Sequence, residues 1–155
     1  MTREGLIVAL ILATGGRHVA LALPPANECS ALSPAQIQKV LGQPFGEPGK
    51  TQAPPAFGKQ PWGTHCTYDS QKGTKGRVDF IIYTDASAAE AKQTFERLMM
   101  WFPAKSKPGG IGDSAYIDSR GAIHVLKGKT RYFLSIDPGD ENHLKELASS
   151  VAAQL

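Results

Sequence analysis

The sequence has few of the features by which enzymes, anchored proteins and nucleic-acid-binding proteins are recognised. It contains two cysteines in 155 residues, and no uncharged hydrophobic run reaches the roughly 20 residues that a membrane-spanning helix needs. The formal net charge is +3, and the basic residues do not gather into a stripe or block. Nucleic-acid binding is therefore not predicted, because such domains normally carry a strongly basic surface.

Catalytic and cofactor motifs are also lacking. Acids, histidines and a serine are present, but none falls in a nucleophile-elbow, metalloprotease or paired-carboxylate pattern. The glycine-rich string at residues 108–116 follows a predicted helix and opens a strand, whereas a dinucleotide fingerprint follows a strand and opens a helix. We therefore assign no catalytic, cofactor-binding or metal-binding residue and expect no cofactor. An enzyme whose site assembles only in the fold stays open, since triads are defined by geometry.

The first residues are typical of a secretory signal peptide. Arg3 precedes an apolar run from Leu6 to Ala13, and residues 20–22 form the Ala-Leu-Ala pattern after which signal peptidase cuts. The sequence thus predicts a signal peptide over residues 1–22 and one exported domain over residues 23–155. We expect this domain in the periplasm or outside the cell, with no membrane span after cleavage.

Cys29 and Cys66 both lie in the predicted mature domain. In an oxidising compartment, an even pair of cysteines is expected to form a disulfide. A metal site that joins the two thiolates to His65 and His124 is the alternative, but no CxxC or HxxxH spacing is present to preform it. Residues 25–28 lack the small-residue pattern that precedes a lipid-modified cysteine, so a soluble protein rather than a lipoprotein is expected.

A short N-terminal helix is predicted after Cys29. Ser33 can cap it, Pro34 suits its first position and Gln36 can complete a capping box, while Gly42 ends it. The next stretch, residues 43–63, holds five prolines and several glycines and keeps no apolar period. It is predicted to be a long surface loop.

The remaining chain divides into two similar halves. Each half reads as a strand, a turn, a second strand and a helix. The predicted strands are residues 64–69, 77–84, 122–126 and 131–136, the helices are residues 87–101 and 140–154, and residues 115–119 add a further strand. Two such units can bury their apolar helix stripes together. The predicted fold is therefore α+β: one antiparallel sheet with helices packed on one face, formed by two strand-strand-helix repeats after the N-terminal helix.

Three short patterns carry a resemblance to known proteins. They are Cys29 with the helix ending in Leu41-Gly42, Cys66 followed by Tyr68, and the string Gly-Ile-Gly-Asp-Ser-Ala-Tyr at residues 110–116. Together they resemble small secreted and lipoprotein α+β domains of bacteria, many without an assigned function. They are also similar to the extracellular sensor domains of some bacterial serine/threonine kinases. The resemblance covers most of residues 29–155 and implies ligand or partner binding without catalysis, but it transfers no site residue.

Side-chain alternation points to a candidate binding surface. If Val78, Phe80 and Ile82 face the helices, their neighbours face the opposite side of the sheet. That open side is unusually apolar for a solvent-facing sheet, so something is expected to cover it, either the 43–63 loop, the first helix or a partner. The candidate partner-binding residues are those on this face and two loop aromatics: Ile81, Tyr83, His124, Leu126, Phe133, Phe57 and Trp62.

The sequence therefore favours an exported binding or interaction domain without catalytic activity. Its partner would be a protein or a small apolar ligand, and its oligomeric state is left open. Two alternatives remain: a periplasmic inhibitor or immunity-type protein that blocks a hydrolase or toxin, and a small secreted enzyme.

Cleavage of the predicted signal peptide can be tested directly. N-terminal sequencing of exported protein should give a start near Leu23, because Ala22 completes the cleavage pattern. Recovery of an intact Met1 in a membrane fraction would contradict the prediction.

Overall fold

A computed structural model describes residues 28–58, 61–71 and 75–155 of the chain. The predicted signal peptide and part of the turn at residues 72–76 lie outside these residues. Twelve elements follow one another in the described chain: η1 (Glu28–Ala31), α1 (Pro34–Leu41), β1 (Gly49–Ala53), η2 (Ala56–Gly58), β2 (Gly63–Asp69), β3 (Arg77–Thr84), α2 (Ala88–Trp101), β4 (Ala104–Ser106), β5 (Ser114–Asp118), β6 (Ile123–Lys127), β7 (Thr130–Asp137) and α3 (Glu141–Ala152).

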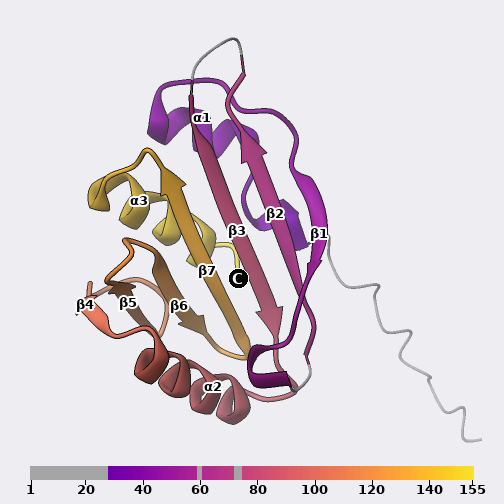
Figure 1. Cartoon of the computed structure of the whole chain (residues 1–155), viewed down its shortest axis with the longest axis vertical. Helices are drawn as coiled ribbons and strands as arrows, with labels where there is room; N and C mark the ends of the chain where they lie inside the picture. Colours follow the sequence, from indigo (N-terminus) through magenta and orange to yellow (C-terminus); the bar gives the residue numbers. More distant parts are fainter. Residues whose placement is uncertain (1–27, 59–60, 72–74) are drawn as a thin grey trace, which may run out of the picture.

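The strands form one antiparallel sheet in the order β1-β2-β3-β7-β6-β5-β4 (Figure 1). The predicted α+β fold is thus confirmed. The two strand-strand-helix units, β2-β3-α2 and β6-β7-α3, meet where β3 pairs with β7. This central pairing runs over the full length of both strands, from Arg77 opposite Asp137 to Thr84 opposite Thr130.

One face of the sheet carries the main hydrophobic core. Alternate residues of β3 and β7 point to this face, among them Phe80 and Leu134, which are fully buried and directly opposite each other. Helices α1 and α3 contact each other and lie behind the sheet as drawn in Figure 1. Their apolar stripes close the core with Ile37 from α1 and Leu147 from α3.

Helix α2 lies on the opposite face, so the prediction that all helices pack on one face is wrong for this helix. Its Ala91 and Phe95 form a separate buried cluster with Tyr116 of β5 and Leu126 of β6. In Figure 1 this helix lies in front of the sheet, whereas α1 and α3 lie behind it. An apolar stripe shows that a helix must be buried, but not which side of the sheet receives it.

Residues 43–63 contain regular structure, which corrects the prediction of one long loop. Strand β1 pairs with β2 over Gly49–Ala53, and η2 follows it. The first four residues of β1 are exposed and largely polar, so the strand has no apolar alternation to reveal it. Its partner strand fixes it through backbone hydrogen bonds instead.

The helix starts follow their capping residues. Ser33 and Gln36 form the predicted capping box of α1, and Gly42 ends that helix with a φ of 71°, a left-handed conformation that glycine adopts without steric cost. Ser87 caps α2, and Asp140 caps α3 by accepting two backbone N–H groups. In the described part of the chain, no helix is long and apolar enough to cross a membrane.

The predicted disulfide is present between Cys29 and Cys66, which are 37 residues apart. Cys66 is buried on β2, and Cys29 belongs to η1, so the bond fastens the start of the described chain to the sheet. Tyr68, two residues beyond Cys66, is also buried, and its hydroxyl donates hydrogen bonds to the carbonyls of Cys29 and Leu32.

Removing the disulfide is expected to destabilise the domain. Replacing both Cys29 and Cys66 by alanine should lower the free energy of unfolding by about 2–5 kcal/mol, because the unfolded chain regains the entropy of the closed loop. Denaturant unfolding of the variant and of the native protein, with and without reductant, measures this. A native protein whose stability does not respond to reductant would contradict the prediction.

Candidate functional site

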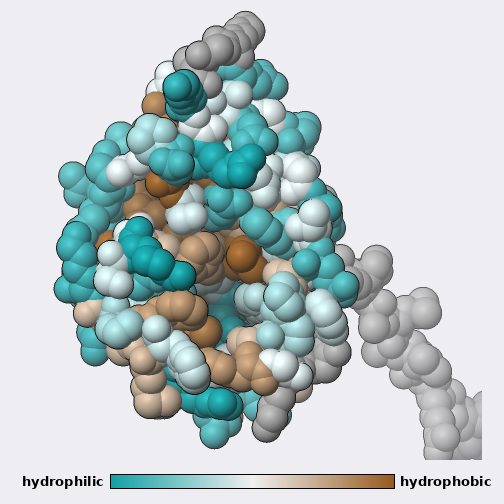
Figure 2. All heavy atoms as spheres, viewed as in Figure 1, coloured by the Kyte–Doolittle hydropathy of each residue, from teal (hydrophilic) through white to brown (hydrophobic). Residues whose placement is uncertain are grey.

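A groove lies on the open face of the sheet, between the central strands and α2. It has a volume of about 210 Å³ and is lined by side chains from both halves of the chain: Ala56, Ile81, Tyr83, Leu98, Phe102, Arg120, His124, Arg131 and Phe133. We call it the sheet groove. Figure 2 shows hydrophobic side chains gathered around a hollow near the middle of this face.

The floor of the sheet groove comes from the central pairing of the sheet. Ile81 of β3 lies directly opposite Phe133 of β7, and Phe133 in turn lies opposite His124 of β6. All three side chains point away from the main core, because the alternate residues of these strands fill it. Ile81 and Phe133 are half-buried, so they offer apolar surface to the groove.

One wall of the groove is formed by α2 and the residue that follows it, which place Leu98 and Phe102 there. Ala56 of η2 forms another part of the rim. The next residue, Phe57, holds η2 against α2: the Arg97 guanidinium lies 4.3 Å from the centre of its ring, and the Trp101 ring is 6.2 Å away. The backbone of Phe57 has a φ of 56°, which is uncommon for a bulky residue, so these contacts offset a strained turn.

A buried ion pair lies at one end of the sheet groove. Arg131 donates to both carboxylate oxygens of Asp85 at 2.6 and 3.1 Å, and both side chains are almost fully buried. The Arg131 guanidinium also lies over the ring of Tyr83, whose hydroxyl donates to the Pro54 carbonyl. Burial raises the pKa of the Tyr83 hydroxyl, although the charge of Arg131 opposes this shift. The phenol thus stays protonated at neutral pH and acts as a donor.

A second buried carboxylate, that of Asp118, binds the polar groups at the other end of the sheet groove. Asp118 accepts hydrogen bonds from the backbone N–H groups of Arg120 and Ala122, from the Arg120 guanidinium at 3.0 Å and from His124 Nε2 at 3.1 Å. Burial alone would raise the pKa of Asp118, but these hydrogen bonds outweigh it and hold that pKa below its usual value. The carboxylate is therefore ionised, and because it can only accept, Nε2 of His124 carries a proton.

His124 lies in a stack of aromatic rings. Its imidazole is parallel to the Tyr116 ring, with ring centres 4.5 Å apart, and faces the Phe102 ring, whose centre is 5.9 Å away. The Phe133 ring is nearly perpendicular to it, with ring centres 5.1 Å apart. Burial lowers its pKa, and the hydrogen bond to Asp118 only partly opposes this effect. His124 is therefore neutral near pH 7 and offers a flat ring rather than a charge.

The structure brings four of the seven sequence-predicted residues together. Ile81, Tyr83, His124 and Phe133 line the sheet groove. Leu126 is on the same face, but α2 buries it. The first helix packs on the other face, whereas α2 covers part of this face and Ala56 of the 43–63 segment reaches the rim of the groove beside it.

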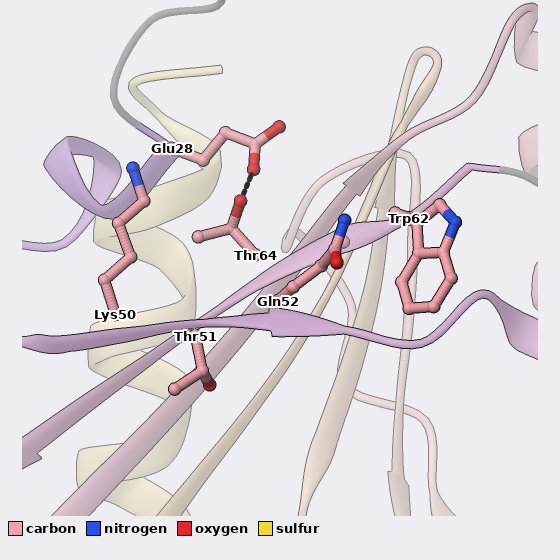
Figure 3. A pocket seen from close by; sticks show the side chains of 7 residues that line it. Glu28, Lys50, Thr51, Gln52, Trp62 and Thr64 are labelled. Carbon is pink, nitrogen blue, oxygen red and sulfur yellow. Dashed lines mark hydrogen bonds between the residues drawn. The ribbon is translucent and has the colours of Figure 1, made fainter.

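The two loop aromatics lie elsewhere. Phe57 packs on α2 beside the groove, whereas Trp62 lines a separate open hollow of about 450 Å³ at the edge of the sheet. Figure 3 shows that hollow, with Trp62 at one end, Lys50 and Gln52 projecting from β1, and Glu28 hydrogen-bonded to Thr64. Most of the residues that line it are polar, in contrast to those of the sheet groove.

Sequence reasoning missed five residues of the sheet groove, namely Ala56, Leu98, Phe102, Arg120 and Arg131. Ala56 belongs to the segment that is predicted to be a loop, and Leu98 and Phe102 follow the apolar stripe of a helix that is expected on the other face. Asp85 and Arg131 are evident in the sequence at the ends of two predicted strands. That they form an ion pair follows only from the register of β3 with β7. Arg120 is in a turn whose position relative to the sheet is not encoded in any local pattern.

The charged groups of the groove are paired with one another. The hydrogen bond of His124 goes to Asp118, and among the described residues no hydrogen bond joins His124 to a serine, threonine or cysteine. The described residues also contain no group of three or more His, Cys, Asp or Glu side chains that could hold a metal ion. A comparison with models of protein families gives no match for the chain, and a comparison with curated proteins gives none either.

Stability should depend on the protonation of His124. Because its pKa is lowered in the folded protein, the unfolded chain binds more protons as the pH falls through about 6.5, the ordinary value for histidine. The free energy of unfolding therefore falls on the acid side of that pH. His124→Gln should lose less stability than the native protein between pH about 7.5 and about 5.5.

Chemical denaturation at the two pH values provides the measurement. His143→Gln is the comparison variant: this histidine lies near the start of α3, where its 43% exposed side chain pairs with the helix-capping Asp140. An equal loss in the native protein and in His124→Gln would show that His124 is not the group responsible.

Proposed function

We propose that this domain is a binding module that holds a small, largely apolar molecule in the sheet groove. The observation that supports this proposal is the apolar lining of an open hollow on a sheet face that the chain itself covers only in part. Ligand sites are typically concave and apolar with a few fixed polar groups. The volume of about 210 Å³ is below the range of drug-sized sites, which favours a ligand of one or two rings or a short acyl chain.

Binding without catalysis is favoured by the chemistry of the polar groups. Asp85 and Asp118 are each fully engaged with arginines or backbone amides, and His124 is held in an aromatic stack. A catalytic pair would need a reacting hydroxyl, thiol or water within hydrogen-bond reach of the base. The polar groups instead fix the shape of the groove.

We also propose that the domain works in the periplasm or outside the cell. The Cys29–Cys66 disulfide supports this location, because disulfides persist in oxidising compartments. The signal-peptide pattern of residues 1–22 and the resemblance to bacterial sensor domains point the same way. A sensor or carrier that recognises a small extracellular molecule would combine these properties.

A protein partner is the second candidate. Met100 and Trp101, at the end of α2, are 73% and 70% exposed, and the Phe57 ring lies beside Trp101. Exposed aromatic and methionine side chains are enriched at protein interfaces. This small patch would suit an inhibitor or immunity-type protein, and it lies at the end of α2 rather than in the sheet groove.

The proposed function predicts that Phe133→Ala weakens the binding of a neutral aromatic probe. Naphthalene-2-methanol is suitable because it is flat, uncharged and small. Loss of the Phe133 contact should lower its affinity on the order of tenfold, as expected when one aromatic contact is removed. Calorimetry or ligand-observed NMR with purified protein measures this effect.

Ser135→Ala is the matched control, because Ser135 is on the same strand and the same face but does not line the groove. It should bind the probe like the native protein. Thermal melts of Tyr83→Ala and Phe133→Ala complete the test. A stability loss of about 3 kcal/mol or more in both variants would show that these rings act as core residues, and a native protein that binds no probe would contradict the proposal.

A further inference from the structure

The charged groups at the sheet groove differ in their exposure to solvent: the two carboxylates are buried, and one arginine is exposed. The Arg120 side chain is 59% exposed, whereas the side chain of its partner Asp118 is 1% exposed. Asp85 is equally buried beneath Arg131. A charged group that enters from solvent therefore meets a guanidinium before it meets either carboxylate.

We propose that the ligand of the sheet groove carries a carboxylate or a similar anionic group, and that Arg120 binds this group at the rim. The inference rests on the proposed function of the groove and names the chemical class of its ligand. The apolar body of such a molecule would lie on Ile81 and Phe133, with its anionic end toward Arg120.

The hydrogen bonds of Arg120 leave room for a second acid. Asp118 accepts from Nε and Nη2 at 3.3 and 3.0 Å, which occupies one edge of the planar guanidinium. A guanidinium has five N–H donors arranged as a fork, so its other edge can bind a carboxylate through two parallel hydrogen bonds. Lysine would offer only a point charge at this place.

Arg120 is also held in position before any ligand arrives. Its guanidinium lies 4.2 Å from the centre of the Phe102 ring, and Asp118 fixes it from below. An arginine that is already ordered loses less conformational entropy when it binds a ligand. The stacked Phe102 ring belongs to the groove lining, so the anion-binding group and the apolar surface are adjacent.

Two probes with the same ring and different charge test the inference. Naphthalene-2-carboxylate and naphthalene-2-methanol differ in the group that would meet Arg120. The native protein should bind the carboxylate at least about tenfold more tightly near neutral pH, since charge-assisted hydrogen bonds are stronger than neutral ones. Arg120→Gln should abolish this preference, so that the variant binds the two probes with affinities within about twofold of each other.

Two further variants separate the role of Arg120 from general charge and folding effects. Arg120→Lys should keep part of the preference, because the charge remains and the fork is lost. Arg77→Gln removes an equally exposed arginine at the far end of β3 and should leave the preference unchanged. A melting temperature near the native value shows that each variant is folded.

The outcomes distinguish this inference from the proposed function. Equal binding of both probes by the native protein would leave the groove as an apolar site and overturn the role of Arg120. A carboxylate preference that persists in Arg120→Gln would also overturn it, because another group would then hold the anion. If neither probe binds to the native protein, the proposed function itself fails.

Discussion

The pairing of β3 with β7 is the interaction on which the rest of the structure depends. It joins the two strand-strand-helix units and sets which residues of both strands share a face. With Phe80 opposite Leu134 on one face, Ile81 must lie opposite Phe133 on the other. A shift of this register by one residue would exchange the two faces, so the core and the floor of the sheet groove depend on the same backbone hydrogen bonds.

The open face is closed only in part because α2 is placed over β5 and β6. There it buries Phe95 against Tyr116, and the ring centres are 5.2 Å apart. The central strands extend beyond this contact and remain uncovered, which produces the groove. The buried pair of Asp85 and Arg131 lies where β3 ends and the chain turns toward α2. Removing one partner would leave an unpaired buried charge at a cost of roughly 3–5 kcal/mol, so the pair also holds this wall of the groove in place.

The parts of this fold that local rules describe were predictable from the sequence, and the parts that depend on distant contacts were not. Ser33, Ser87 and Asp140 mark the helix starts by capping chemistry, and alternation on the strand segments placed Ile81, Tyr83, His124 and Phe133 on one face. Strand β1 could not be predicted because it is largely polar and exposed. It forms a strand because its backbone pairs with β2. The side of the sheet that α2 covers depends on how the chain between β3 and β4 packs, and not on the spacing of apolar residues along the helix. The burial of Leu126 depends on the same packing.

Asp118 links the stability of the fold to the chemistry of the groove. Its carboxylate accepts the backbone N–H groups that shape the turn from β5 to β6, and it also orients His124 on the floor and Arg120 at the rim. A substitution of Asp118 would therefore change the turn, the imidazole and the guanidinium at once, and the separate effects could not be assigned. Arg120 makes its contacts at the exposed end of this network. Its replacement leaves the buried hydrogen bonds of Asp118 to His124 and Ala122 in place, so a loss of ligand discrimination there reports on recognition rather than on folding.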